Sequence, residues 1–170
     1  KEWAPFLAPL YALLEGLFIG AISAMFSYAF ETVAPNIVMN AVGITFGTVI
    51  AMYILFSTRI IKVTETFRAV IFTATLGIAI FYLIAMVMNA FGWGNLSFLH
   101  EGSALGIGFS LFVVAIAALN LVLDFDMIEK GSAMGAPKYM EWYAAFGLMV
   151  TIVWLYLEIL RLLAKLSSRK

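Results

Sequence analysis

The sequence predicts an all-α protein that crosses a membrane several times, and three observations lead to this fold class. The chain has 170 residues, of which 64% are hydrophobic and 12% charged, whereas soluble domains carry about 25% charged residues. The apolar residues form long continuous runs rather than the short alternating strands of a membrane β-barrel. Because only helices and closed barrels satisfy the backbone in lipid, these runs predict a polytopic helical bundle.

Five segments are long enough to cross the bilayer, since a spanning helix needs about 20 apolar residues. They are expected at about residues 4–30, 36–57, 67–91, 103–123 and 139–163. Short polar connections separate them, which indicates one transmembrane domain over residues 1–170.

Pairs of glycines four residues apart occur in two of these segments and at the start of a third, and this spacing lets helix backbones approach closely. The pairs are Gly16–Gly20, Gly43–Gly47 and Gly102–Gly106. We expect them to pack helices within the chain, with dimerisation as the alternative.

Charge is balanced, with ten basic and ten acidic residues, so no overall field favours nucleic acid as a partner. Basic residues gather in cytoplasmic loops of membrane proteins. This places the Lys1 end and the connections 58–68 and 126–138 in the cytoplasm, because these connections hold Arg59, Lys62, Arg68, Lys130 and Lys138. The connections around Glu31 and around His100–Glu101 hold no Lys or Arg and are expected outside.

The basic C-terminal residues conflict with this topology. A fifth complete crossing places Lys165, Arg169 and Lys170 outside, against the charge rule. Either the tail is an exception, or the last apolar segment does not cross completely.

Three carboxylates need an explanation, because an ionisable side chain at the helix centre costs about 2.5–3.5 kcal/mol on insertion scales. They are Glu15, Asp124 and Glu158. Glu15 is expected near the bilayer middle, where it either hydrogen-bonds a polar side chain of a neighbouring helix or has a functional role.

Asp124 and Asp126 are two residues apart, about 200° around a helix, so they cannot enter one pocket while the helix continues. Asp124 extends the apolar face of Leu121 and Ile128, which makes it the buried candidate. Asp126 is expected to be solvated at the start of a polar loop.

Glu158, Arg161 and Lys165 share one helix face, and two accounts of this face are open. In the first, Glu158 pairs with Arg161 and the long side chains extend towards the interface. In the second, Glu158 meets Asp124 from another helix, and the two carboxyls share a proton and act as a pH sensor. Their four oxygens would bind calcium only weakly, since calcium prefers six to eight.

Enzymatic activity is not expected, and no cofactor is predicted. Cysteine is absent, which excludes thiol chemistry and disulfides. The stretch "HEGSA" at His100 lacks the second histidine of a zinc protease, and no phosphate-binding GxxxxGK[ST] motif occurs.

Four stretches in order resemble the Bax inhibitor motif membrane proteins, in particular the bacterial Bax-inhibitor-like members. They are "EGLFIGAIS" with "PNIVMNAVGITFGTVIAMY", "STRIIKVTETFRA", "LNLVLDFDMI" and "LYLEILRLL". The resemblance implies a bacterial inner-membrane protein with seven helices, of which the five segments here are helices three to seven.

The resemblance also implies a pH-dependent calcium leak with an acidic pair on the last two helices as sensor, here Asp124 and Glu158. This sequence departs from the family by having Glu where the second Asp is usual and a long connection between the two motifs. The family's acidic pair is latched by an Arg of the second helix, for which Arg161 is the candidate substitute.

Three functional hypotheses follow. The first is a pH-sensitive calcium leak or cation channel, in which calcium or protons are the transported partners. The second is an interaction protein that modulates a membrane protease or a survival factor. The third is a proton-coupled transporter that uses Glu15 as an additional site.

Overall fold

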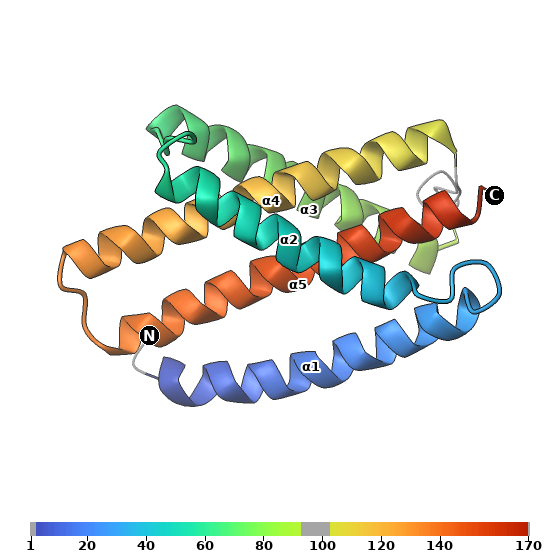
Figure 1. The fold of residues 1–170 in the computed structure, drawn as a ribbon, viewed down its shortest axis with the longest axis horizontal. Coiled ribbons are helices and arrows are strands. Elements are labelled where there is room, and N and C mark those ends of the chain that lie inside the picture. The colour runs from blue at the N-terminus through green and yellow to red at the C-terminus, as the bar shows by residue number, and fades with distance from the viewer. Residues whose placement is uncertain (1–2, 93–102, 170) are drawn as a thin grey trace.

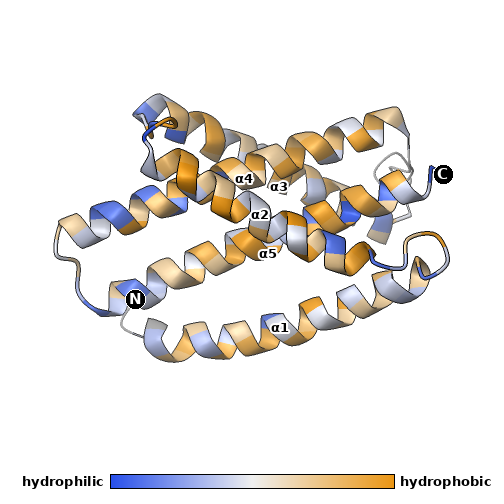
Figure 2. Cartoon of the chain, viewed as in Figure 1, coloured by the Kyte–Doolittle hydropathy of each residue, from blue (hydrophilic) through white to orange (hydrophobic). Residues whose placement is uncertain are grey.

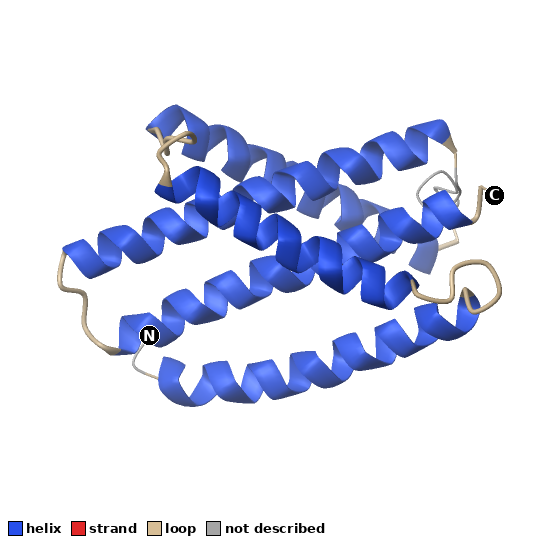
Figure 3. Cartoon of the chain, viewed as in Figure 1, coloured by secondary structure: helices blue, strands red, loops and turns tan. Residues whose placement is uncertain are grey.

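The computed structural model describes residues 3–92 and 103–169, and this part of the chain contains five helices and no strand. The helices are α1 (Ala4–Ala29), α2 (Ile37–Ser57), α3 (Glu65–Ala90), α4 (Ala104–Ala133) and α5 (Tyr139–Ser167) (Figures 1 and 3). All five are long and apolar enough to cross a membrane. The predicted all-α class, with five helices long and apolar enough to span a membrane, is therefore confirmed. Lys1 and residues 100–102, to which expectations were attached, lie outside the described residues.

The helix pair α4–α5 forms the centre of the bundle (Figure 1). α2 packs across both members of the pair, α1 packs on α5, and α3 packs on α4. The 58–64 and 134–138 connections lie at the end of the bundle where α1 begins. We call this end of the bundle the basic end. The 30–36 connection and the C-terminus lie at the opposite end (Figure 1).

α4 continues ten residues beyond the predicted segment, and this corrects the expected loop over 126–138. The helix ends where Gly135 adopts a left-handed conformation with φ of 64°. The Ala136 amide then donates to the Gly131 carbonyl and the Gly135 amide to the Ser132 carbonyl. These two hydrogen bonds form a Schellman motif, so α4 ends at a glycine and not at the acidic residues that precede it.

α3 begins at Glu65 because the Thr64 side chain accepts a hydrogen bond from the Phe67 amide. Arg68 therefore belongs to the first turn of α3 rather than to the preceding connection. α5 is one uninterrupted helix of 29 residues. At 1.5 Å per residue it is about 43 Å long, enough to cross a bilayer. The two accounts of the basic tail, an exception to the charge rule or an incomplete last crossing, both stay predictions.

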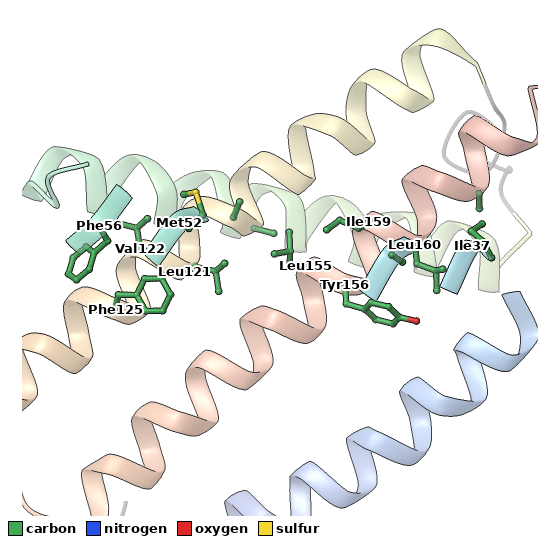
Figure 4. Packing of buried hydrophobic residues seen from close by; sticks show 14 residues of the cluster. Ile37, Met52, Phe56, Leu121, Val122, Phe125, Leu155, Tyr156, Ile159 and Leu160 are labelled. Carbon is green, nitrogen blue, oxygen red and sulfur yellow. The ribbon is translucent and has the colours of Figure 1, made fainter. Parts of the chain in front are cut away.

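The apolar core lies between α2, α4 and α5 (Figure 4). Leu121 and Val122 of α4 and Leu155 and Leu160 of α5 have no exposed surface. A second cluster joins α3 to α4. The outward surfaces of the helices are also largely apolar (Figure 2), so the helices are held together by close packing and polar contacts, not by a contrast between apolar core and polar surface.

The glycine pairs of α1 and α2 do not pack helices within the chain, which corrects that expectation. A Cβ atom added at Gly16, Gly20, Gly43 or Gly47 would meet no other atom within 4 Å. These faces point away from the rest of the described bundle. Gly106 is buried in α4, while its expected partner Gly102 is not described.

Candidate functional site

Glu158 is the centre of a buried charged cluster between α5 and α3. Its side chain is 2% exposed. The Tyr82 hydroxyl of α3 donates to its carboxylate and lies 3.1 Å from both oxygens. Arg161 donates through Nη1 to Glu158 Oε1 at 2.8 Å and to the Tyr82 hydroxyl at 2.9 Å. We call Tyr82, Glu158 and Arg161 the Glu158 cluster.

The predicted Glu158–Arg161 pair is confirmed, and it follows from their spacing of three residues on one helix. Arg161 also lies over the Tyr82 ring, with Cζ 5.2 Å from the ring centroid. The Arg161 side chain keeps 41% of its surface exposed, so it covers Glu158 from the outside. The negative charge is thus matched by one cation and one hydroxyl.

Lys165 lies one turn beyond this cluster and turns into the bundle. Its Nζ donates to the Ser110 hydroxyl at 2.7 Å and to the Gly106 carbonyl at 3.1 Å, both on α4. It is 3% exposed. Among the ion pairs of the described residues none involves Lys165, so neutral oxygens alone hold the amine.

Asp124 lies against α5 near the basic end. Its Oδ2 is buried without a hydrogen-bond partner. Its Oδ1 lies 3.9 Å from the position that a Cβ at Gly147 would take, and the Thr151 hydroxyl is its polar neighbour. This distance is an ordinary van der Waals contact, so Asp124 packs directly on α5 at Gly147.

The expected contact between Asp124 and Glu158 is not formed, and this is a correction. Asp124 lies level with Gly147 of α5, and Glu158 follows eleven residues later on the same helix. Eleven residues correspond to about 16 Å along the axis. Two carboxyls at that separation cannot share a proton through a direct hydrogen bond, which spans about 2.5–3.0 Å.

Asp126 is not solvated, which corrects a second expectation. It is 7% exposed and lies within α4. Its Oδ2 accepts from Arg68 at 2.9 Å and from Lys130 at 2.8 Å. Lys130 is its neighbour one turn later, but Arg68 comes from α3, a contact that sequence spacing could not indicate. A separate bidentate pair joins Arg59 to Glu129 at the same end.

Polar side chains with partners on other helices recur along α4 between Ser110 and Asp126. Between the two aspartates and Ser110, the Asn120 side chain donates to Thr75 of α3 at 2.8 Å and to the Ile116 carbonyl at 2.9 Å. From Asp126 to Ser110 there are sixteen residues, or roughly 24 Å of helix, against a hydrocarbon core of about 30 Å. We call this series the polar column: Asp126, Asp124, Asn120, the Glu158 cluster, and Ser110 with Lys165.

Glu15 does not belong to the polar column. It lies half-buried near the middle of α1. Its polar neighbour is Tyr11, one turn earlier on the same helix. Tyr11 in turn packs edge-on against Phe146 of α5, with ring centroids 4.8 Å apart.

No resident metal site is formed within residues 3–92 and 103–169, where no three His, Asp or Glu side chains converge. Asp124 and Glu158, the expected weak calcium ligands, lie too far apart along α5 to bind one ion together.

Sequence reasoning missed Tyr82, Asn120, Ser110 and the role of Lys165. A tyrosine or an asparagine within an apolar helix is a usable signal, since such groups need a partner in lipid. The identity of the partner comes only from the packing of α3 and α5 on α4.

Five long apolar helices with charged and polar side chains buried between them define a polytopic α-helical membrane protein. A family model described as Bax inhibitor 1 like matches residues 1–168, so the chain belongs to that family. The resemblance noted in the sequence is thereby confirmed. Comparison with curated proteins and with solved structures gave no match.

Proposed function

We propose that this protein is a pH-responsive cation leak pathway, with calcium as the transported ion. The observation that carries the proposal is the polar column, which extends over roughly 24 Å of α4. Ionisable groups inside a membrane are costly and mark ion or proton pathways when they face the bundle interior. Membership of the Bax inhibitor 1 like family supports the same reading.

Asp124 is the residue at which a proton or a cation would act first. A buried acceptor oxygen without a donor costs free energy, so Oδ2 of Asp124 is where a positive charge gains most. One carboxyl with a nearby hydroxyl offers few oxygens, so calcium, which prefers six to eight, would be held briefly with water as the remaining ligands.

The Glu158 cluster is the closed element of this pathway. Its carboxylate is engaged by Tyr82 and Arg161, so it is not free to receive a passing cation. Opening requires these contacts to separate, and protonation of a carboxyl in the column would shift the balance between packings that differ by a few kcal/mol. α3 and α5 would then move apart where Tyr82 now joins them.

We place the basic end in the cytoplasm of a bacterial inner membrane. The described residues at that end include Arg59, Lys62, Arg68, Lys130 and Lys138, and basic residues favour the cytoplasmic side. Asp124 is the deeper of the two aspartates near this end and would sense cytoplasmic pH.

Calcium flux into proteoliposomes between pH 6 and 8 tests the proposal. Asp124→Asn should reduce the flux and flatten its pH response, while Glu158→Gln should raise the flux by weakening the closed cluster. Glu141→Gln, which removes an exposed carboxylate of α5, is the matched control and should leave both unchanged. A flux and pH response that neither Asp124→Asn nor Glu158→Gln alters would show the proposed pathway to be wrong.

A second candidate is an interaction protein that modulates a membrane protease or a survival factor. The glycine faces of α1 and α2 favour it, because no part of the described chain packs on them and small residues allow close helix contacts. Under this candidate, a membrane protein partner co-purifies in mild detergent, and Asp124→Asn does not release it. The same purification of Gly16→Leu should lose the partner.

A further inference from the structure

The buried amine of Lys165 is the feature of the polar column that the cation pathway does not explain. A lysine near a helix end can normally extend its amine to the headgroup region. α5 ends at Ser167, so that region lies within about one turn of Lys165. The side chain nevertheless turns inward and is 97% buried, since its exposed fraction is 3%.

The charges around Lys165 do not balance. With all groups ionised, this half of the column holds Arg161, Lys165 and one carboxylate, that of Glu158. That carboxylate bonds Arg161 at 2.8 Å and makes no ion pair with Lys165. Lys165 is instead held by Ser110 and Gly106, whose oxygens are neutral. A net positive charge therefore remains at the end of the column opposite Asp126.

We propose that Lys165 is a selectivity residue that slows cations at this end of the column, divalent cations most strongly, and so limits the calcium flux of the proposed pathway to a leak. The inference rests on the proposed leak function. A fixed ammonium repels a passing ion in proportion to the charge of that ion, so calcium meets twice the electrostatic barrier that potassium meets. In a medium that screens poorly, this difference is large enough to set which ion passes.

Lys165→Met is a suitable perturbation because it keeps an unbranched side chain of similar length and removes only the amine. Ser110 would not be left without a partner. Its hydroxyl lies one turn after the Gly106 carbonyl on the same helix, so it can bond back to that oxygen. Lys165→Gln keeps a polar end without charge. It is the second variant, to be used if the Met variant does not purify as a monodisperse protein–detergent complex.

The control is Arg169→Met. Arg169 is a basic residue at the same end, but it is exposed and lies beyond the last residue of α5. It changes the net charge of the protein as Lys165→Met does and leaves the interior untouched.

The experiment measures calcium and potassium flux in proteoliposomes of the full chain at one pH and ionic strength. We expect Lys165→Met to raise the calcium-to-potassium permeability ratio about tenfold and Arg169→Met to leave it unchanged. Equal increases for both ions, or the same change in Arg169→Met, would overturn the inference while leaving the leak in place. Flux in none of the variants above protein-free vesicles would overturn the leak and the inference together.

Discussion

Removing the Tyr82 hydroxyl should destabilise the bundle through the contact between α3 and α5. Tyr82→Phe keeps the ring, and so keeps the position under Arg161 and the edge-on contact with Phe109. What disappears is one oxygen that donates to the Glu158 carboxylate and accepts from Arg161. The variant therefore isolates one hydrogen-bonding group inside the charged cluster.

The magnitude follows from the burial and charge of the acceptor. A hydrogen bond to a charged group contributes about 1.5–3 kcal/mol in soluble proteins, whereas double-mutant cycles between membrane helices average about 0.6 and reach about 1.7 kcal/mol. Glu158 is 2% exposed and engages the hydroxyl with both oxygens. We therefore expect Tyr82→Phe to lower the free energy of unfolding by about 1.5 kcal/mol, near the upper value measured between membrane helices.

A double-mutant cycle with Glu158→Gln checks this value. The variants are unfolded by increasing the mole fraction of sodium dodecyl sulphate in mixed micelles, and helicity and tryptophan fluorescence report the transition. The coupling free energy between positions 82 and 158 should be about 1 kcal/mol, above the roughly 0.3–0.5 kcal/mol within which independent sites add.

The matched control is Tyr53→Phe, since Tyr53 of α2 also packs its ring edge-on against a phenylalanine, Phe125, and is largely exposed. It should cost less than about 0.5 kcal/mol. Additive behaviour of the Tyr82 and Glu158 variants, or an equal cost at Tyr53, would refute the reasoning that the hydroxyl joins the two helices.

Two further predictions concern the ends of the helices and use the same unfolding measurement. Asp126→Asn should lower the free energy of unfolding by about 1–3 kcal/mol, because Lys130 loses its anion and Arg68 keeps only the exposed Glu65. Glu129→Gln, in an exposed pair, should lower it by less than about 1 kcal/mol, and equal losses for the two variants would contradict the difference in burial. Gly135→Ala should cost about 1–2 kcal/mol because φ is 64° there; Gly77→Ala, within α3 and with open space around a new Cβ, should be neutral or stabilising, and a tolerated Gly135→Ala would mean that α4 does not need this residue to end.

The five spanning helices could be predicted because each depends on its own composition, which hydropathy measures directly. Helix ends were harder to predict from the sequence. The 126–138 stretch contains Asp126, Glu129 and Lys130 and was therefore expected to be a loop, yet a central helix can carry such residues when partners neutralise them. The Glu158–Arg161 pair could be predicted from the sequence because both members lie on one helix. Tyr82 and Arg68 could not, since their contacts join helices whose relative positions the sequence does not state.

The two aspartates of α4 explain why one step of the sequence argument failed. Their spacing of two residues does turn them to different sides of the helix, as expected: Asp124 meets α5 and Asp126 meets Arg68 of α3. The error was to assume that the second side must be solvated. α4 packs against α2, α3 and α5, so at the level of Asp126 the side of α4 that faces α3 is covered as well as the side that faces α5. A helix at the centre of a membrane bundle can bury acids on two sides, and each then acquires its own partners: cations for Asp126, and an open oxygen beside α5 for Asp124.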